Sequence, residues 1–371
     1  MQITCSRNLL LENIQIVSKA VSSRSTLAIL ECVLLSAYED SFKMTANDLE
    51  IAVETGDIAA DVKESGSVAL DAKLFFEIVR KLPDAQVLIR SDENNVTVIK
   101  CQKAQFKILG MPGEEFPALP EVEKTKYASI KANELKNMVK RTVFAVSADD
   151  SKPVLTGELI EINKGELNIV AVDGYRVALC QAHTSGDGVE DAYVVIPAKT
   201  LSEICRILPS EDDLEVKLWF TKNHALAETG GPVVVSRLLE GDFIKYKQLF
   251  TEGYNTKALV DRMTFLMCVE RASLIASREI KKNPVKIKID EGVMSVSSFT
   301  EIGDFYDEID IRSDGPGIEI SFNPRFIIDA LKTIDDENVA LRFTTPLSPC
   351  VITGDEDLNV KHLILPLRFN G

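Results

Sequence analysis

A few neighbouring side chains in this sequence have the types that nucleophilic catalysis uses. Ser151 and Lys152 directly follow Asp149 and Asp150, so a hydroxyl and an amine stand beside two carboxylates. Such a short polar run is, however, more typical of a solvated turn than of an active site. Phosphate-binding glycine loops, the dinucleotide fingerprint, the nucleophile elbow and the metalloprotease motif do not occur in the sequence. The sequence therefore predicts no catalytic residue and favours a protein that is not an enzyme.

Residues that bind metals or form disulfides are scattered. The histidines lie far apart without metal-ligand spacing, and the acidic runs at 210–215 and 353–359 lack the spacing of a calcium loop. The pair Asp307 and Glu308 is more typical of a solvated strand. We expect no metal and no cofactor. The cysteines occur singly, which is typical of reduced thiols packed as small apolar groups: Cys5, Cys32, Cys101, Cys180, Cys205, Cys268 and Cys350.

The stretch AVDGYRVALC, residues 171–180, suggests a binding site. Asp173 and Gly174 between two apolar runs predict a tight hairpin turn, since glycine tolerates the positive φ of such turns. The first third of the chain has a counterpart in ANDLEIAV, but Tyr175 and Arg176 occur only in the middle third. The pair is either strand filler or one wall of a site, and a pair special to one copy of a repeat favours the second interpretation.

The elements that position this turn come from a repeat. Similar segments begin at Val68, Val194 and Ile318, and each predicts a strand, a helix, an acidic turn and another strand. Asp71 and Asn323 are good helix N-caps. The predicted helices cover 71–82, 197–208 and 323–334, and a basic residue recurs near the start of each: Lys73, Lys199 and Arg325.

An amphipathic helix opens each third, over 7–24, 131–147 and 258–278, with apolar residues spaced as on one helix face. Paired strands follow it, with short turns at 38–41, 163–165 and 290–292. The sequence thus predicts an α+β protein built from three tandem copies of one unit, each with two helices and two small antiparallel sheets. The predicted domains are 1–125, 126–251 and 252–371.

Composition limits the class of protein. The chain has 371 residues, 45% of them hydrophobic and 27% charged, which is typical of a globular protein with two or three domains. It has no apolar run of about 18 residues, and its N-terminus lacks the apolar core of a signal peptide. We expect a cytoplasmic protein.

Positive charge is concentrated on the predicted helices, although the whole chain has a net charge of −15. A basic helical face suits the phosphate backbone of duplex DNA, contacted without sequence readout, since no cluster of residues suited to base edges is present. The alternative is that these side chains only maintain solubility. The candidate DNA contacts are Arg24, Lys73, Arg80, Lys136, Lys140, Arg141, Lys199, Arg206, Arg325 and Lys332.

In order and spacing, these features resemble the bacterial sliding clamp family, the beta subunit of the replicative DNA polymerase III holoenzyme. The resemblance covers essentially the whole chain. It implies a head-to-tail homodimer, a closed ring of six similar domains whose helices line a hole for duplex DNA. Besides the triplication, it rests on RSTLAILECVLL (24–35), ANDLEIAV (46–53), GEEFPALP (113–120), AVDGYRVALC (171–180), LLEGDFIKY (238–246) and LPLRF (365–369).

The family's function implies a non-catalytic processivity factor that tethers the replicative polymerase, the clamp loader, other polymerases and repair proteins through short peptide motifs. Its ring interface would use Lys73, Ile78, Phe106 and Ile108 of the first domain, although Ile78 also suits a plain core. The third domain would contribute Leu274 and Ile275. Arg24, before STL, matches a residue that touches DNA in the family.

The resemblance also implies a hydrophobic pocket for partner peptides between the second and third domains, with Arg176 and Arg368 as polar orienting groups. The chain departs from the family at Val172, Tyr175, Ile244 and Gln248, which puts peptide preference in doubt. The alternative function is an acidic three-repeat scaffold that binds peptides without encircling DNA. The matching pocket positions are Lys152, Val154, Leu155, Val172, Gly174, Tyr175, Arg176, Val177, Ile244, Leu249, Ile280, Asn323, Phe326, Leu347, Leu363, Ile364, Leu365, Pro366, Leu367 and Arg368.

Overall fold

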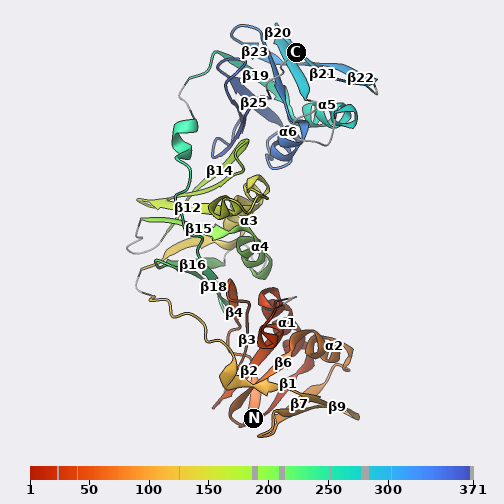
Figure 1. Cartoon of the computed structure of the whole chain (residues 1–371), viewed down its shortest axis with the longest axis vertical. Helices are drawn as coiled ribbons and strands as arrows, with labels where there is room; N and C mark the ends of the chain where they lie inside the picture. Colours follow the sequence, from red (N-terminus) through yellow and green to blue (C-terminus); the bar gives the residue numbers. More distant parts are fainter. Residues whose placement is uncertain are drawn as a thin grey trace. The chain divides into compact units, whose positions relative to one another are not determined.

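The computed structural model describes residues 1–22, 25–39, 41–124, 126–185, 191–208, 214–250, 253–276, 284–301 and 303–367 (Figure 1). The chain divides into two compact units. The first unit comprises 1–135, 184–190 and 199–238, and the second comprises 136–183, 191–198 and 239–371.

The first unit contains two antiparallel sheets. A five-stranded sheet has the order β5 (Ala60–Glu64), β1 (Gln2–Ser6), β7 (Gln86–Ser91), β8 (Val96–Cys101) and β9 (Ala104–Leu109). A nine-stranded sheet has the order β10 (Met111–Pro112), β6 (Gly66–Asp71), β2 (Cys32–Tyr38), β3 (Ser41–Asn47), β4 (Ile51–Glu54), β18 (Val233–Arg237), β17 (His224–Glu228), β16 (Glu215–Phe220) and β11 (Ala128–Lys131).

The second unit also contains two antiparallel sheets. Its nine-stranded sheet has the order β15 (Ala192–Pro197), β12 (Gly157–Asn163), β13 (Glu166–Val172), β14 (Arg176–His183), β27 (Val360–Ile364), β26 (Cys350–Gly354), β25 (Asn338–Phe343), β19 (Thr256–Asp261) and β23 (Arg312–Asp314). Its four-stranded sheet has the order β22 (Gly303–Asp310), β21 (Val293–Thr300), β20 (Val285–Asp290) and β24 (Ile318–Phe322).

The sheets join neighbouring repeats, which the sequence did not predict. Strand β4 of the first repeat pairs with β18 of the second, and β14 of the second pairs with β27 of the third, both antiparallel. Each nine-stranded sheet therefore combines strands of two repeats. The predicted boundaries near 125 and 252 lie outside the described residues and stay predictions.

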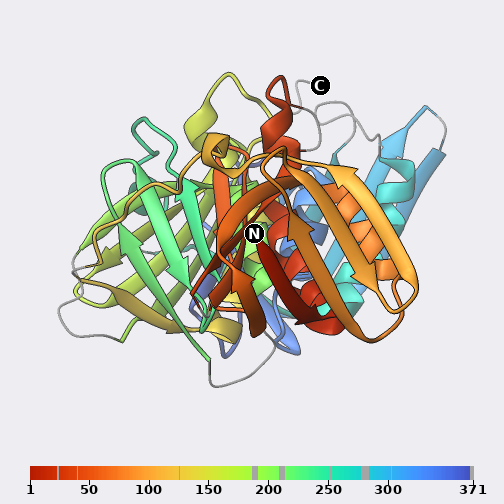
Figure 2. The same ribbon diagram turned by 90° about the horizontal axis from the view of Figure 1, so that it is seen from below.

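The described residues contain two helices per repeat, as predicted: α1 (Arg7–Val17), α2 (Ala72–Lys81), α3 (Ala132–Lys140), α4 (Ala198–Ile207), α5 (Arg262–Ile275) and α6 (Pro324–Leu331). The predicted ends of the first and third helices at 24 and 147 were wrong, since α1 ends at Val17 and α3 at Lys140. In the first unit, α1 and α2 pack side by side against the strands (Figures 1 and 2). Asp71 and Asn323 cap α2 and α6 by accepting hydrogen bonds from the backbone amides of Leu74 and Arg325. The predicted N-caps are therefore confirmed.

The predicted start of the helix at 258 was wrong. Residues 256–261 form strand β19, which pairs with β25, and the helix begins at Arg262. The side chain of Asp261 accepts a hydrogen bond from the amide of Thr264 and so caps the helix. The apolar residues Ala258 and Val260 fit both periodicities, but they are buried in a strand of the core.

The Asp-Gly turn has the predicted conformation, with φ of +88° at Gly174. Its counterpart in the first repeat has the same construction. The Asp173 side chain accepts hydrogen bonds from the amides of Tyr175 and Arg176, as the Asp48 side chain does from those of Glu50 and Ile51. The repeat copies this turn, whereas the two side chains after Gly174 are specific to the middle copy.

Candidate partner-binding site

One face of the nine-stranded sheet in the second unit carries an apolar cluster. Val172 on β13 lies opposite Val177 on β14, which lies opposite Leu363 on β27, so the three side chains share a face. Leu155 precedes β12 and packs against them, and Val154 and Ile244 are partly buried at its edge. The structure thus brings these predicted pocket residues together. We call the buried group the apolar cluster; its members are Leu155, Leu159, Val170, Val172, Val177, Leu179, Val195, Phe243, Tyr246 and Leu363.

Aromatic side chains between residues 243 and 250 pack in and against the apolar cluster. Two of them lie in the motif 238–246, but the sequence did not assign them to the site. Phe243 and Tyr246 are buried in it, and Phe250 packs at its edge. The Tyr246 hydroxyl donates a hydrogen bond to Glu161, and burial together with this carboxylate raises the pKa of Tyr246. The spacing of these aromatics by three and four residues is the sequence signal for their common placement.

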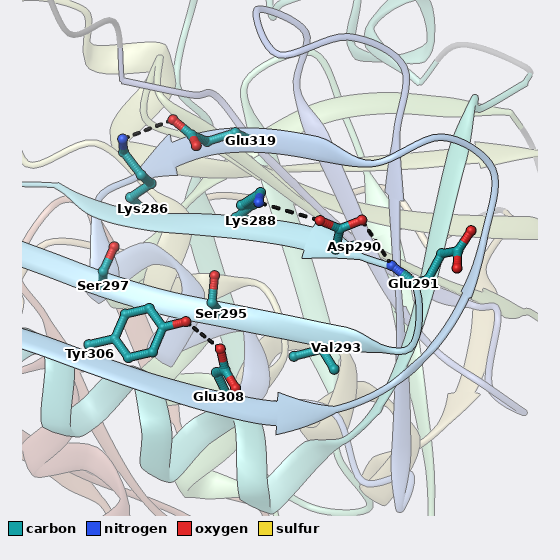
Figure 3. A pocket seen from close by; sticks show the side chains of 10 residues that line it. All are labelled: Lys286, Lys288, Asp290, Glu291, Val293, Ser295, Ser297, Tyr306, Glu308 and Glu319. Carbon is teal, nitrogen blue, oxygen red and sulfur yellow. Dashed lines mark hydrogen bonds and ion pairs between the residues drawn. The ribbon is translucent and has the colours of Figure 1, made fainter.

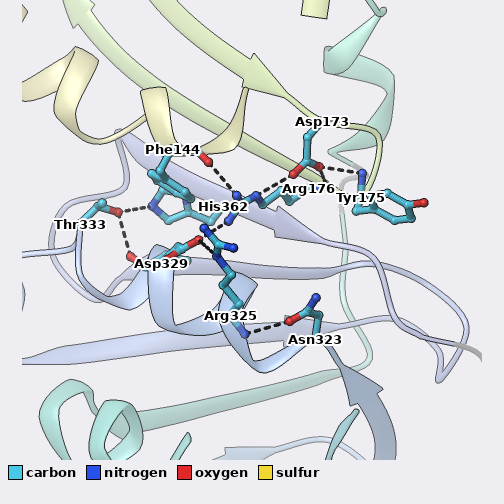
Figure 4. A network of polar contacts seen from close by, with 10 residues as sticks. Phe144, Asp173, Tyr175, Arg176, Asn323, Arg325, Asp329, Thr333 and His362 are labelled. Carbon is cyan, nitrogen blue, oxygen red and sulfur yellow. Dashed lines mark hydrogen bonds and ion pairs between the residues drawn. The ribbon is translucent and has the colours of Figure 1, made fainter. Parts of the chain in front are cut away.

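Arg176 points to the opposite face from Val177, as strand alternation requires. Its guanidinium donates from Nε to Asp173 at 2.9 Å, from Nη1 to Asp329 at 2.6 Å and from Nη2 to the carbonyl of Phe144 at 2.6 Å (Figure 4). It lies over the rings of Phe144 and Phe326, 5.0 and 4.6 Å from their centroids. Only 8% of Arg176 is exposed.

This placement changes the role predicted for Arg176. Its guanidinium has internal partners on the turn and on α6, so little of it is open to a peptide, and its predicted role in orienting a peptide stays a prediction. Tyr175 beside it is exposed and stacks on Phe326, with ring centroids 6.2 Å apart. The amide of Leu365 donates to the carbonyl of Tyr175, so the turn also fixes the C-terminal segment.

A neutral histidine borders this network. His362 is fully buried, its Nε2 lies 3.0 Å from the hydroxyl of Thr333, and its ring lies 5.5 Å from that of Phe144. Burial, helped by the charges of Arg176 and Arg141, lowers the pKa of His362 to about 3. Protonating the ring would place a further cation in a buried site.

We therefore expect stability to fall as the pH drops below 6.5. The unfolded chain takes up a proton on His362 near pH 6.5, and the folded chain does so only near pH 3. The His362→Gln variant should lose up to about 1.4 kcal/mol per pH unit of this dependence between pH 6.5 and 4. Chemical denaturation at several pH values measures it. Exposed His183→Gln is the control, and equal slopes for wild type and His362→Gln would contradict the expectation.

The other predicted pocket residues are divided by burial. Lys152, Gly174, Leu249, Leu347 and Leu365 are exposed, and Pro366 and Leu367 are half-buried. Asn323, Phe326 and Ile364 are buried, with Ile364 in the core beneath α6. Ile280 and Arg368 lie outside the described residues.

The predicted DNA contacts lie on or beside helices, apart from Arg24, which is outside the described part of the chain. Several have carboxylate partners: Arg80 with Glu77, Lys199 with Asp48, Arg206 with Glu203, Arg325 with Asp329 and Lys332 with Glu270. Lys73 and Lys140 are exposed, and Lys136 is half-buried. Arg141 donates to Asp335 and Asp357, which leaves it the least available of the set.

The predicted interface residues lie near two sheet edges. Phe106 and Ile108 are on β9, the edge of the five-stranded sheet, and Lys73 is exposed on α2. Leu274 ends α5 with 79% of its surface exposed, and Ile275 is half-buried. Ile78 is only 5% exposed, so the core interpretation fits it better, and it offers little surface to a second chain.

The other sequence expectations can be compared with the structure. Asp149, Asp150, Ser151 and Lys152 form the expected exposed turn, in which the Asp149 side chain accepts a hydrogen bond from the amide of Ser151. Burial raises the pKa of the Cys5, Cys32 and Cys180 thiols to about 11, as suits inert packed groups. No helix within the described ranges is long and apolar enough to cross a membrane.

Comparisons with known proteins agree along the whole chain. Family models described as the N-terminal, central and C-terminal domains of the DNA polymerase III beta subunit match residues 1–120, 129–245 and 247–368. A beta sliding clamp of Staphylococcus aureus is 33% identical, with 99% of each chain covered. The crystal structure of the DNA polymerase sliding clamp from Bacillus subtilis is 32% identical with a TM-score of 0.95, covering 100% of this chain and 99% of that one. That of the DNA polymerase III subunit beta from Pseudomonas aeruginosa is 26% identical with a TM-score of 0.93, covering 99% and 100%.

Proposed function

The chain belongs to the DNA polymerase III beta subunit family, the beta sliding clamps, and we propose that two copies of it close head to tail into a ring around duplex DNA. Membership of this family makes it a non-catalytic processivity subunit of the polymerase, and not an acidic scaffold that only binds peptides. We also propose that it acts in the cytoplasm and that its domains are 1–125, 126–251 and 252–371.

The strand pairing between repeats supports the ring most directly. Each repeat contributes two groups of antiparallel strands, and each group has one last strand. The first group ends at β4 in the first repeat, β14 in the second and β22 in the third. The second group ends at β9, β18 and β27 in the same three repeats. Within the chain, β4 pairs with β18 and β14 pairs with β27. Strands β22 and β9 are the remaining equivalents, and both are sheet edges. Pairing β22 of one copy with β9 of another would repeat the same junction and make a third kind of nine-stranded sheet.

Exposed apolar side chains at both edges fit this junction. Leu109, with 77% exposed, and Phe106 lie on β9. Leu274 is exposed in the last turn of α5. Phe299 is exposed on β21, the strand that pairs with β22. Unpaired edge strands with apolar side chains favour association with another chain. A heterologous pairing of two different edges is also the kind that builds rings.

Contact with DNA would be weak and independent of sequence. The basic helix residues proposed for it are mostly exposed, but nearby carboxylates offset much of their charge. Partly neutralised cations reduce the number of counterions released from DNA and so weaken binding. Encirclement retains the protein without tight contacts, which suits a subunit that slides.

We further propose that the apolar cluster, with the exposed side chains of Tyr175, Leu347 and Leu365, docks the aliphatic and aromatic anchors of partner peptides. The proposal is supported by these three exposed side chains and by the partly buried Val154 and Ile244, which pack against the buried part of the apolar cluster. The replicative polymerase, the clamp loader and repair proteins are the partners we expect, through short peptide motifs.

A topological experiment tests the ring. The protein is assembled on nicked circular DNA with a clamp loader and ATP, and the DNA is then cut once. We expect retention on the circle and rapid loss from the linear form, because an encircling ring slides off a free end. Equal retention on both forms, or no loading at all, would contradict encirclement.

A further inference from the structure

A second feature of the same sheet face has no role in the function proposed so far. A cavity of about 790 Å³ lies between strands β25, β26 and β27 and the segment Gly253–Asn255. Its volume is within the range of about 300–1,000 Å³ that is typical of binding sites. The amide of Asn255 donates to the carbonyl of Phe343 at 2.8 Å, and its side chain donates to the carbonyl of Thr344 at 2.6 Å. These bonds fasten this wall of the cavity to β25.

Two cations line the cavity, and none of its described lining residues is acidic. Arg342 donates from Nη1 to the hydroxyl of Thr353 at 2.7 Å and lies 5.9 Å from the ring centroid of Tyr254. Lys361 is half-buried. Neither cation has a carboxylate partner among the described residues. Burying a cation without a carboxylate partner costs free energy, and this chain has a net charge of −15. Two half-buried cations in one cavity whose described lining has no acid therefore suggest that an anionic ligand pairs with them.

A second cavity shows what charged groups do elsewhere in this unit. It has a volume of about 470 Å³ and lies on the four-stranded sheet (Figure 3). There Lys286 pairs with Glu319 at 2.8 Å and Lys288 with Asp290 at 3.3 Å. That surface pairs each of its two lysines with a carboxylate and carries further acidic groups, whereas the described lining of the cavity beside β25 holds two cations and no acid.

The cavity is continuous with the apolar cluster. Phe250 and Val351 pack against the cluster and also line the cavity. Leu249, a predicted pocket residue, lines the cavity as well. Val351 lies opposite Arg342 on one side and Leu363 on the other, so the cluster and Arg342 share one sheet face. Leu363 and Arg342 are two strands apart, about 10 Å, which an extended peptide spans with about three residues.

We propose that this cavity binds a carboxylate side chain of the partner peptide, about three residues beyond the anchor that docks on the apolar cluster. The inference rests on the peptide site of the proposed function. An acidic segment is favoured over a free anion because the cavity wall is apolar where it meets the cluster and cationic beyond it. A peptide with an apolar anchor followed by Asp or Glu matches that order of surfaces.

Fluorescently labelled peptides test this inference. One carries Leu and Phe anchors alone, and others add two Glu or two Gln three residues beyond the anchors, at either end. We expect the Glu peptide of one polarity to bind the wild type about tenfold more tightly than its Gln counterpart. Lys361→Gln should reduce this advantage to about threefold, and Arg342→Gln combined with Lys361→Gln should abolish it. Binding of the anchor-only peptide should stay unchanged.

Lys288→Gln is the matched control, since it removes one positive charge from the other cavity, on the four-stranded sheet. This variant should keep the tenfold higher affinity for the Glu peptide. Lys361→Gln carries the test if the double variant folds poorly, because the Lys361 ammonium has no partner among the described residues. Equal affinity for Glu and Gln peptides, or equal effects of Lys361→Gln and Lys288→Gln, would overturn the inference while anchor binding persists. Failure of the anchor-only peptide to bind would overturn the peptide site and this inference together.

Discussion

Replacing Leu274 by Asp is expected to convert the proposed dimeric ring into monomers. Leu274 is 79% exposed in the single chain, so the substitution should leave folding unchanged. Across the proposed junction it would bury a carboxylate instead of a leucine, which forfeits about 1.5–3 kcal/mol of apolar burial and adds a desolvation cost of similar size. About 4 kcal/mol per interface corresponds to a dissociation constant about 1,000-fold higher. A closed ring has two such interfaces, so both are weakened.

Sedimentation velocity over a range of protein concentrations measures this effect. Met263→Asp is the matched control, because Met263 is exposed on the first turn of the same helix α5, far from its C-terminal end. We expect this variant to remain dimeric. A Leu274→Asp protein that stays dimeric at nanomolar concentration, or a wild type that is monomeric at micromolar concentration, would count against the proposed junction.

Replacing Arg176 by Ala should both destabilise the second unit and weaken peptide binding. The change removes hydrogen bonds to Asp173, Asp329 and the Phe144 carbonyl. It leaves two largely buried carboxylates without their closest cation. Breaking a buried ion pair in this way costs about 3–5 kcal/mol. Loss of the turn that holds Tyr175 and Leu365 should also reduce peptide affinity at least about tenfold, or 1.4 kcal/mol.

Arg325→Ala provides a control on the same carboxylate. Arg325 reaches Asp329 only at 3.8 Å, and its side chain is 82% exposed. As a surface ion pair it should contribute about 0.5 kcal/mol or less. Thermal unfolding and peptide titration of both variants separate a positioning role from a general loss of charge. If the two variants behave alike, the network around Arg176 does not hold the site.

Local sequence signals predicted most of the fold, because caps, turns and repeat phase are encoded by neighbouring residues. Asp71, Asn323 and the Asp173–Gly174 turn all have the expected geometry. The pairing of β4 with β18 was not predictable in this way, since any free edge strand offers the same backbone groups. Where a strand runs straight into a helix, as at Asp261, apolar spacing alone did not locate the boundary.

The site was predicted in part. The pocket residues were predicted from the family resemblance, and alternation along β13 and β14 agrees in placing Val172 and Val177 on one face and Arg176 on the other. The partners of Arg176 were not predictable, because Phe144 and Asp329 come from elements distant in sequence. Likewise, nothing near Arg342 or Lys361 in the sequence indicates that the two cations line one cavity.

The free edges at β9 and β22 have a consequence for assembly symmetry. Two different edges that recognise each other allow every added copy to present a new free edge, so growth ends only when the accumulated rotation returns to the start. The rotation that each junction, β4–β18 and β14–β27, would add between neighbouring repeats therefore contributes to whether the assembly closes into a circle or grows as an open filament. A mutation that changed the rotation at either junction, although it touched neither β9 nor β22, would be expected to change the number of subunits in the ring or to produce fibres.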